Sequence, residues 1–234
     1  MKNEVWSRSC IAAPSLISVG DFLNLGASVA ELEQAGTEML HIDILDGHFS
    51  PSMPLGFNSV SAVRKATDLF FDAHVMTENN DYYIGELIEI GADQIVFHAE
   101  TEKHIDNQIN RIHRAGIKAG VALKPATPLS LIEYVLEKCD SVLLMLINPG
   151  YAGAATEKQV PYAWRKVREL NRMIRAQGLE TKVILDGRIS RENIAEFGGK
   201  EANIFVAGST CLDKRNLEAS MKELLKLCED KENS

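Results

Sequence analysis

Eight short apolar segments alternate with stretches of helical periodicity along this chain, and the alternation restricts the fold more than any other feature. The segments are rich in Val, Ile and Leu and lack polar alternation, which is typical of strands buried on both faces of a parallel sheet. They lie at residues 10–13, 39–45, 70–76, 94–98, 119–123, 141–146, 182–186 and 204–207. Eight strand–helix units in 234 residues favour a single (β/α)8 TIM-barrel domain, residues 1–234, over an open doubly wound sheet.

The helical patterns between those segments often end at a glycine, the residue that most readily adopts the left-handed conformation after a helix. Gly36, Gly91 and Gly116 are examples. We expect helices at residues 22–35, 59–66, 82–90, 105–115, 129–138, 162–177, 191–197 and 217–227. The charged residues 229–234 follow the last helix, and we expect this tail to be frayed.

Composition argues against several classes of protein. A net charge of −8 is unfavourable for binding nucleic acid. No apolar run approaches the roughly 18 residues of a membrane span, and residues 1–10 lack the apolar core of a signal peptide. The four cysteines are far apart, which is typical of reduced thiols in the cytosol. We therefore expect a cytoplasmic protein that binds neither nucleic acid nor membranes.

Ionisable residues occur close to the carboxyl ends of three predicted strands, where the catalytic residues of a TIM barrel lie. His41 and Asp43 are two residues apart and share one face of the second strand, His74 lies in the third strand, and Asp186 ends the seventh. If all four point into the barrel, two imidazoles and two carboxylates meet in one cavity. That donor set suits one divalent ion of Zn, Fe, Mn or Co. A purely structural role for all four is unfavourable, because buried ionisable groups are costly without partners.

Glycine-containing loops at other strand ends are candidates for binding phosphate. The sixth strand runs into a loop that contains Gly150 and Gly153. The eighth strand runs into Gly208 and Ser209, which could open a short helix. Phosphate sites at a helix N-terminus after the last strands recur in TIM barrels.

Four further residues at strand ends have both a functional and a structural interpretation. Ser15 could contact a substrate or cap a turn. Met76 and Met145 could form a polarisable wall against a reacting centre or simply pack. His98 could face a substrate or pack in the core.

Eight motifs occur in one order along about residues 11–225, and together they resemble the ribulose-phosphate 3-epimerase family. They are APSLIS, HIDILDGHFSP, DAHVM, GADQIVFHAE, AGIKAGVALKPATPL, LLMLINPGYAG, ILDGRI and FVAGST. The resemblance implies a metal-dependent epimerase that inverts C3 of a ketose phosphate, with ribulose 5-phosphate and xylulose 5-phosphate as the first candidates. It also implies a homo-oligomer.

The resemblance assigns roles to particular residues. It implies that His41, Asp43, His74 and Asp186 bind the metal, and that Asp43 and Asp186 act as the paired acid and base. Epimerisation through an ene-diolate requires removal of a proton on one face and its return on the other, which two carboxylates can perform. The substrate contacts that we expect are Ser15, His74, Gly150, Tyr151, Ala152, Gly153, Gly187, Arg188, Gly208 and Ser209.

The chain departs from the family pattern around the expected phosphate site. Arg188 stands where the family usually has a second glycine after the strand-seven aspartate. Ala152 and Ala154 replace a glycine and a glutamine, and Leu45 replaces a methionine. The Arg188 guanidinium could clamp a phosphate, or it could crowd the approach of the backbone amides. The expected chemistry is therefore better defined than the expected substrate.

Three alternatives stay open. The substrate could be a six-carbon ketose phosphate such as allulose 6-phosphate. The chain could instead decarboxylate a sugar-acid phosphate, with Lys124 as the candidate lysine. It could also be a non-catalytic barrel that binds phosphate ligands. Residues 51–56 and 151–156 are candidates for loops that close over a substrate.

Overall fold

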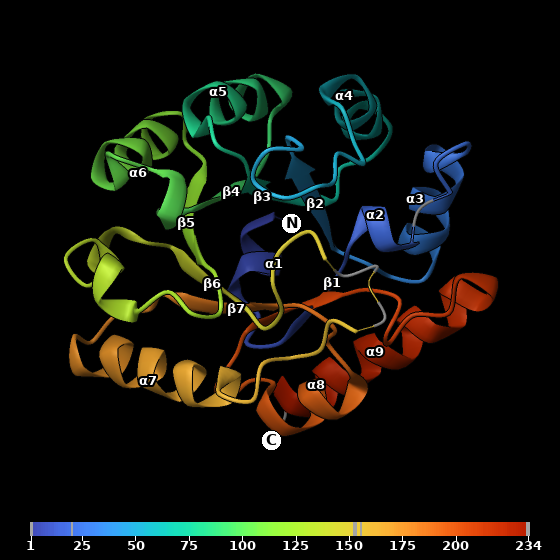
Figure 1. The fold of residues 1–234 in the computed structure, drawn as a ribbon. Helices are drawn as coiled ribbons and strands as arrows, with labels where there is room; N and C mark the ends of the chain where they lie inside the picture. The colour runs from blue at the N-terminus through green and yellow to red at the C-terminus, as the bar shows by residue number, and fades with distance from the viewer. Residues whose placement is uncertain (1, 20, 152–153, 155, 233–234) are drawn as a thin grey trace.

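The computed structural model describes residues 2–19, 21–151, 154 and 156–232 as a parallel sheet surrounded by helices (Figure 1). The sheet has eight strands in the hydrogen-bonded order β1-β8-β7-β6-β5-β4-β3-β2, and a bridge between Ser15 and His41 joins its two edges. The predicted TIM barrel is therefore confirmed. The strands are β1 Ile11–Pro14, β2 Met39–Leu45, β3 Phe70–Met76, β4 Gln94–His98, β5 Lys118–Leu123, β6 Ser141–Met145, β7 Lys182–Asp186 and β8 Ile204–Ala207.

Helices pack around the outside of the barrel, close to the ranges expected from the sequence. They are α3 Leu25–Gln34, α4 Phe57–Ala66, α5 Asn80–Ile90, α6 Ile105–Arg114, α7 Ala163–Ala176, α8 Arg191–Phe197 and α9 Leu217–Glu232. A short helix that was not expected, α2 Leu16–Val19, follows β1. Two 3-10 turns, η1 Ala99–Thr101 and η4 Lys214–Asn216, follow β4 and precede α9.

The expected helix at 129–138 is wrong. The segment forms two 3-10 turns, η2 Leu129–Ile132 and η3 Leu136–Lys138. Leu129, Ile132 and Leu136 are its buried residues. Side chains spaced three or four residues apart can face the core from two 3-10 turns as well as from one α-helix. Ser130 and two β-branched residues in the segment also have poor helix propensity.

The expected fraying of residues 229–234 does not hold for 229–232, where α9 continues to Glu232. The Glu232 carboxylate accepts a hydrogen bond from the backbone N–H of Ser9 at 2.9 Å. Cys228, one turn earlier, is buried. These contacts hold the end of α9 against the segment that precedes β1.

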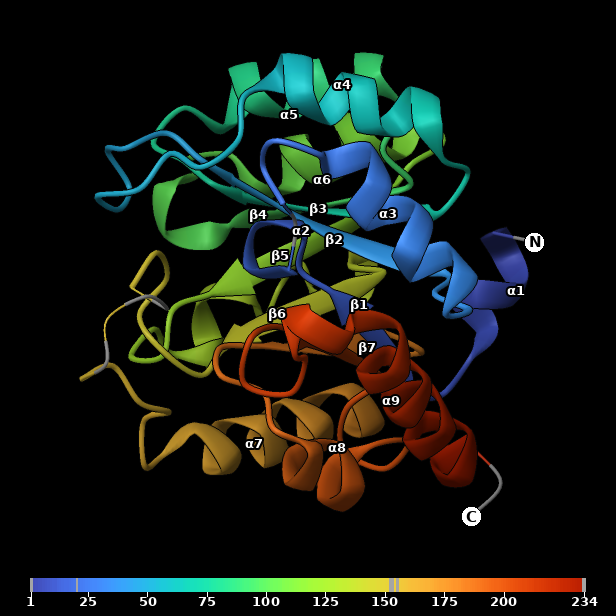
Figure 2. The same ribbon diagram turned by 90° about the vertical axis from the view of Figure 1, so that its right-hand side faces the viewer.

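An additional helix, α1 Lys2–Ser7, was not expected from the sequence, and it covers one end of the barrel. The Trp6 ring stacks on Phe70 of β3 with 5.8 Å between ring centroids. Val5 is buried among the side chains that fill the barrel interior. Figure 2 shows α1 at one end of the barrel and the blue loop after β2 at the other. The strand ends opposite α1 therefore remain available for a site.

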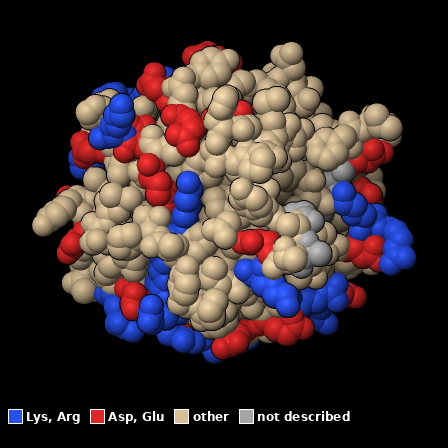
Figure 3. All heavy atoms as spheres, in the orientation of Figure 1, with Lys and Arg blue, Asp and Glu red and all other residues tan. Residues whose placement is uncertain are grey.

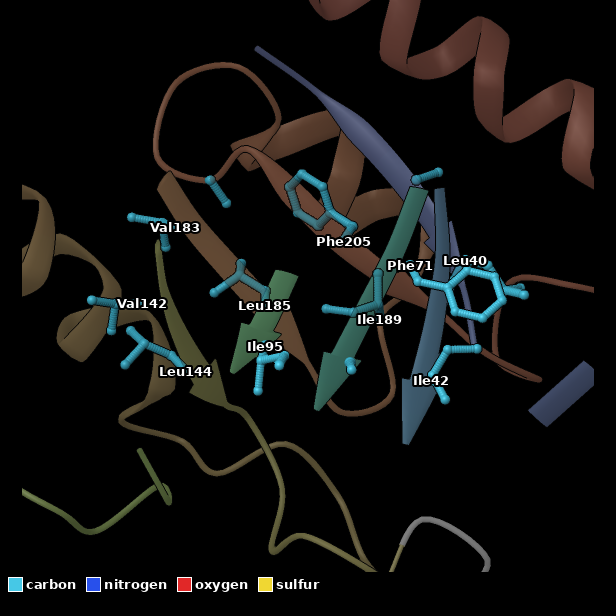
Figure 4. Close-up of a cluster of buried hydrophobic side chains, with 14 of the residues drawn as sticks. Leu40, Ile42, Phe71, Ile95, Val142, Leu144, Val183, Leu185, Ile189 and Phe205 are labelled. Atoms are coloured by element: carbon cyan, nitrogen blue, oxygen red, sulfur yellow. The ribbon is translucent and has the colours of Figure 1, made fainter. Parts of the chain in front are cut away.

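Alternate residues of each strand build two separate layers. Side chains such as Leu40, Ile42 and Phe71 belong to the layer between the strands and the helices, part of which Figure 4 shows. Side chains such as Met39 and Ile184 fill the barrel interior. The interior-facing positions of β2 next along the strand are the polar His41 and Asp43, so the apolar interior gives way to polar groups toward the carboxyl ends.

No helix within the described ranges is long and apolar enough to cross a membrane. Basic and acidic side chains are interspersed around the edge of the face seen in Figure 3. The cytoplasmic location and the homo-oligomeric state stay predictions.

Replacing Trp6 with Ala should lower the free energy of unfolding by about 1–3 kcal/mol, because the ring is only partly buried and full burial would give about 3–5 kcal/mol. Urea unfolding measures the change. Tyr134→Ala is the control, because Tyr134 is 91% exposed and its loss should cost less than about 0.5 kcal/mol. Equal losses for the two variants would contradict the role of α1 in closing the barrel.

Candidate metal centre and active site

Four ionisable side chains from three strands meet at the carboxyl end of the barrel. His41 and Asp43 come from β2, His74 from β3 and Asp186 from the end of β7. One donor atom from each lies within 4.8 Å of the others. Parallel pairing explains part of the arrangement, because Asp43 lies directly opposite His74 in the β2–β3 register. The structure thus brings together the four residues that the sequence pattern selected.

The orientation of the two imidazoles leaves one nitrogen of each facing the cluster. His41 Nδ1 lies 2.7 Å from Asp72 Oδ2, so His41 Nε2 points toward Asp43 Oδ1, 3.2 Å away. His74 Nε2 lies 3.1 Å from His98 Nε2, so His74 Nδ1 faces the carboxylates. Both inward nitrogens are buried and have no hydrogen-bond partner among the described residues. A cation between them would give each lone pair a partner, so these residues fit a divalent metal.

The charges of the cluster reinforce this interpretation. Burial tends to lower the pKa of His41, but Asp43 and Asp72 favour its charged form and hold the pKa well above its ordinary value. Burial likewise opposes the charge on His74, whose pKa is nevertheless raised, mainly by Asp186 and Asp43. Burial also opposes the charge on Asp43, but His41 and His74 lower its pKa. The cluster therefore favours positive charge between its carboxylates, which a divalent ion supplies while both imidazoles stay neutral.

A cavity of about 160 Å³ opens above this cluster at the strand ends. Asp43 and Asp186 form part of its lining, and Met76 and Met145 supply an apolar wall. The Ser15 hydroxyl donates to Asp43 Oδ2 at 2.8 Å, which fixes one carboxylate at the edge of the cavity. Expected site residues that line the cavity are Ser15, Asp43, Met76, Met145, Gly150, Asp186, Gly187, Arg188, Gly208 and Ser209.

Other expected substrate contacts lie elsewhere. His74 is fully buried beneath the cavity, and Tyr151 is 45% exposed and outside the lining. Ala152 and Gly153 lie outside the described residues. The lining also includes residues that were not among the expected substrate contacts: Ile17, Ser18, Leu45, Ser52, Ile147, Val206 and Thr210.

Two glycines of the lining are required by close packing. Gly187 has a φ of 114°, and an added Cβ would lie 2.9 Å from the backbone nitrogen of Ile147. Gly150 has a φ of 84°, and an added Cβ would collide with the side chain of Ser50. Both positions therefore need glycine for conformation as well as for space.

Arg188 occupies an unusual backbone conformation for its type. Its φ is 50°, and it is the one non-glycine residue with positive φ in the part of the chain that the structure describes. Its Nη2 donates to the carbonyl of Ala154 at 2.7 Å. It is also the one lysine or arginine among the described residues that line the cavity. A strained position that delivers a cation to a cavity with two carboxylates is a candidate functional feature.

Buried polar residues behind the two imidazoles were missed by sequence reasoning. Asp72 Oδ1 accepts a hydrogen bond from Gln94 Nε2 at 3.0 Å, and Gln94 Nε2 also lies 3.0 Å from the Ser141 hydroxyl. Asp72 is two residues before His74 and shares its face of β3, so the alternation of the strand could have identified it. His98 is buried and does not line the cavity, and its ring nitrogen contacts His74.

Comparison with known proteins identifies the lineage. The model of the ribulose-phosphate 3 epimerase family matches residues 11–212. The chain belongs to this family. The ribulose-phosphate 3-epimerase of Bacillus subtilis is 38% identical over 213 residues, which cover 91% of this chain and 96% of the relative. The ribulose-phosphate 3-epimerase of Escherichia coli K12 is 34% identical over 215 residues, which cover 92% and 94%.

Solved structures with low sequence identity support the fold. KGPDC from Streptococcus mutans has a TM-score of 0.69 at 14% identity, and the match covers 95% of this chain and 99% of that chain. The tryptophan synthase alpha subunit from Legionella pneumophila has a TM-score of 0.62 at 14% identity, with 98% of each chain covered.

His98 Nδ1 lies 2.9 Å from the Glu100 carboxylate, and the pH dependence of stability tests the hydrogen bonds around Glu100. Burial tends to raise its pKa, but hydrogen bonds from His98, Thr127 and the Lys124 backbone lower the pKa from 4.5 to about 2. A lowered pKa means that Glu100 contributes stability above about pH 4.5 and loses it as the pH falls toward about 2. The difference in unfolding free energy between the wild type and Glu100→Gln should therefore shrink between pH 5 and pH 3 in urea titrations. A difference that stays constant would contradict the network.

Proposed function

We propose that this chain is a metal-dependent ketose-phosphate 3-epimerase that interconverts ribulose 5-phosphate and xylulose 5-phosphate. The observation that carries the proposal is the position of Asp43 and Asp186, two carboxylates from different strands that flank two inward-facing imidazole nitrogens at the floor of one cavity. The relatives from Bacillus subtilis and Escherichia coli are both named ribulose-phosphate 3-epimerase.

One divalent ion of Zn, Fe, Mn or Co would be held by His41 Nε2, His74 Nδ1 and the carboxylates of Asp43 and Asp186. Such an ion would supply positive charge that stabilises the negative charge developing on the substrate when C3 loses its proton.

The two carboxylates would share the proton transfer. One carboxylate removes the C3 proton from one face of the substrate, and the resulting ene-diolate receives a proton at C3 from the carboxylic acid on the other face. Asp43 and Asp186 would exchange protonation states in each turnover. The Ser15 hydroxyl holds one oxygen of Asp43, and Met76 and Met145 present an apolar surface beside the reacting carbon.

The substrate phosphate would bind between Gly187, Arg188, Gly208 and Ser209. This part of the cavity places two glycines and the Ser209 side chain beside Arg188. A dianionic phosphate entering a protein of net charge −8, beside two carboxylates, gains from a local cation.

The rival activities have less support. Lys124, the lysine considered for decarboxylation, lies with Nζ 3.9 Å from the centroid of the Phe49 ring and outside the cavity lining. A non-catalytic role would leave the buried Asp43 carboxylate in a costly arrangement without a use. A six-carbon ketose phosphate differs from ribulose 5-phosphate in length and not in the chemistry at C3, so the same assay distinguishes the two substrates.

Replacing Asp186 with Asn should reduce incorporation of solvent deuterium at C3 of ribulose 5-phosphate by at least about 100-fold, because general acid–base groups contribute roughly 10²–10⁴. NMR in D2O with Zn²⁺-, Mn²⁺- or Co²⁺-loaded protein measures the exchange. Allulose 6-phosphate is run in parallel to name the preferred sugar. Exchange in neither sugar with metal-loaded wild type would overturn the assignment.

Replacing Arg188 with Gly should raise KM for ribulose 5-phosphate about tenfold to a hundredfold and leave kcat within a few-fold, because a charged hydrogen bond contributes about 1.5–3 kcal/mol. The variant should also unfold at higher urea concentration, since glycine relieves the positive φ. Steady-state kinetics and urea unfolding measure the two effects. A lower KM would mean that Arg188 crowds the phosphate instead of binding it.

A further inference from the structure

A second line of buried residues stands behind His74, on the side away from the cavity. His74 Nε2 lies 3.1 Å from His98 Nε2, and His98 Nδ1 lies 2.9 Å from Glu100 Oε2. Both imidazoles are fully buried, and the Phe49 ring covers His98 with 4.7 Å between ring centroids. The three side chains form a continuous path from the cluster to the start of the loop after β5.

The far end of this path is fixed by backbone. Glu100 Oε1 accepts a hydrogen bond from the backbone N–H of Lys124 at 2.6 Å and a second one from the Thr127 hydroxyl. A backbone N–H can only donate, so the oxygen at this position must accept. The other carboxylate oxygen of Glu100 is thereby aimed at His98.

Proton counting along the path gives one consistent arrangement. The Glu100 carboxylate can only accept, so His98 Nδ1 carries the proton between them. A neutral His98 then has a bare Nε2, which must accept from His74 Nε2–H. His74 is left with its lone pair on Nδ1, the buried atom that faces Asp43 and Asp186.

We propose that His98 and Glu100 are positioning residues that hold His74 in the tautomer whose bare Nδ1 faces the metal cluster. This inference rests on the metal site of the proposed function. His41 is held differently, because its Nδ1 contacts the Asp72 carboxylate directly at 2.7 Å. His41 is therefore oriented by a carboxylate that contacts it directly. His74 is oriented by the Glu100 carboxylate through His98.

Glu100→Gln tests the path with an almost isosteric change. The Lys124 N–H requires the new amide oxygen at the Oε1 position, which turns the amide NH2 toward His98 Nδ1. His98 must then accept at Nδ1 and donate from Nε2, which forces the proton of His74 onto Nδ1. Metal binding has to reverse this preference, so we expect a metal affinity about 10–100-fold weaker.

The measurement is titration of Co²⁺ and Zn²⁺ into chelator-treated full-length protein, in competition with a chromophoric chelator. Circular dichroism checks that each variant is folded. Glu102→Gln is the matched control, because it removes the same charge two residues further along the chain. The Glu102 carboxylate accepts a hydrogen bond from the backbone N–H of His104 at 2.9 Å. It should bind both metals as the wild type does.

His98→Leu provides a second variant with a distinct signature. It interrupts the path, so adding Glu100→Gln to it should weaken metal binding no further. Nitrogen-15 NMR of the Zn²⁺-loaded wild type, in which the metal keeps His74 neutral, should show protons on His98 Nδ1 and His74 Nε2.

Unchanged metal affinity in Glu100→Gln when the wild type binds metal would overturn the inference, and so would a His98 Nδ1 without a proton in the Zn²⁺-loaded wild type. Additive losses in the double variant would also contradict it, since they would indicate separate structural effects. A wild type that binds neither Co²⁺ nor Zn²⁺ would instead reject the proposed metal site itself, and the positioning role with it.

Discussion

Two imidazoles and one carboxylate are buried at one end of the barrel beside a second, half-buried carboxylate, and this burial is the constraint on which the rest of the site depends. Buried ionisable groups are costly unless each has a partner. His41 and His74 are fully buried and Asp43 is 5% exposed, so each of these groups relies on contacts within the protein. The outward nitrogen of His41 contacts Asp72, and the outward nitrogen of His74 contacts His98. The inward nitrogens remain for a cation, and the cluster becomes fully satisfied only when one is bound.

The barrel makes this arrangement possible by separating its interior into two zones. Near α1, Trp6, Phe70 and other apolar side chains fill the interior, so this end contributes packing rather than chemistry. Toward the carboxyl ends the same inward positions carry His41, Asp43 and His74. Strands that are hydrogen-bonded on both sides hold these groups rigidly, which suits a site where donor atoms must keep fixed positions.

Much of this could be predicted from the sequence, because strand alternation is a local property. The spacing of His41 and Asp43 places them on one face, and the order of strands brings Asp186 to the same end. Three features depend on contacts between distant residues and could not be predicted: the packing of α1 under the barrel, the positive φ of Arg188, and the path from His74 to Glu100. The 3-10 turns after β5 were missed because their apolar spacing also fits a helix.

The most direct test of the account is anomalous diffraction at the zinc edge from crystals grown with Zn²⁺. The account predicts one strong peak bonded to His41 Nε2, His74 Nδ1 and oxygens of Asp43 and Asp186, at about 2.0–2.2 Å from each. Absence of a peak among these four residues, in protein that still exchanges the C3 proton of its substrate, would contradict the central claim that this cluster is a catalytic metal centre.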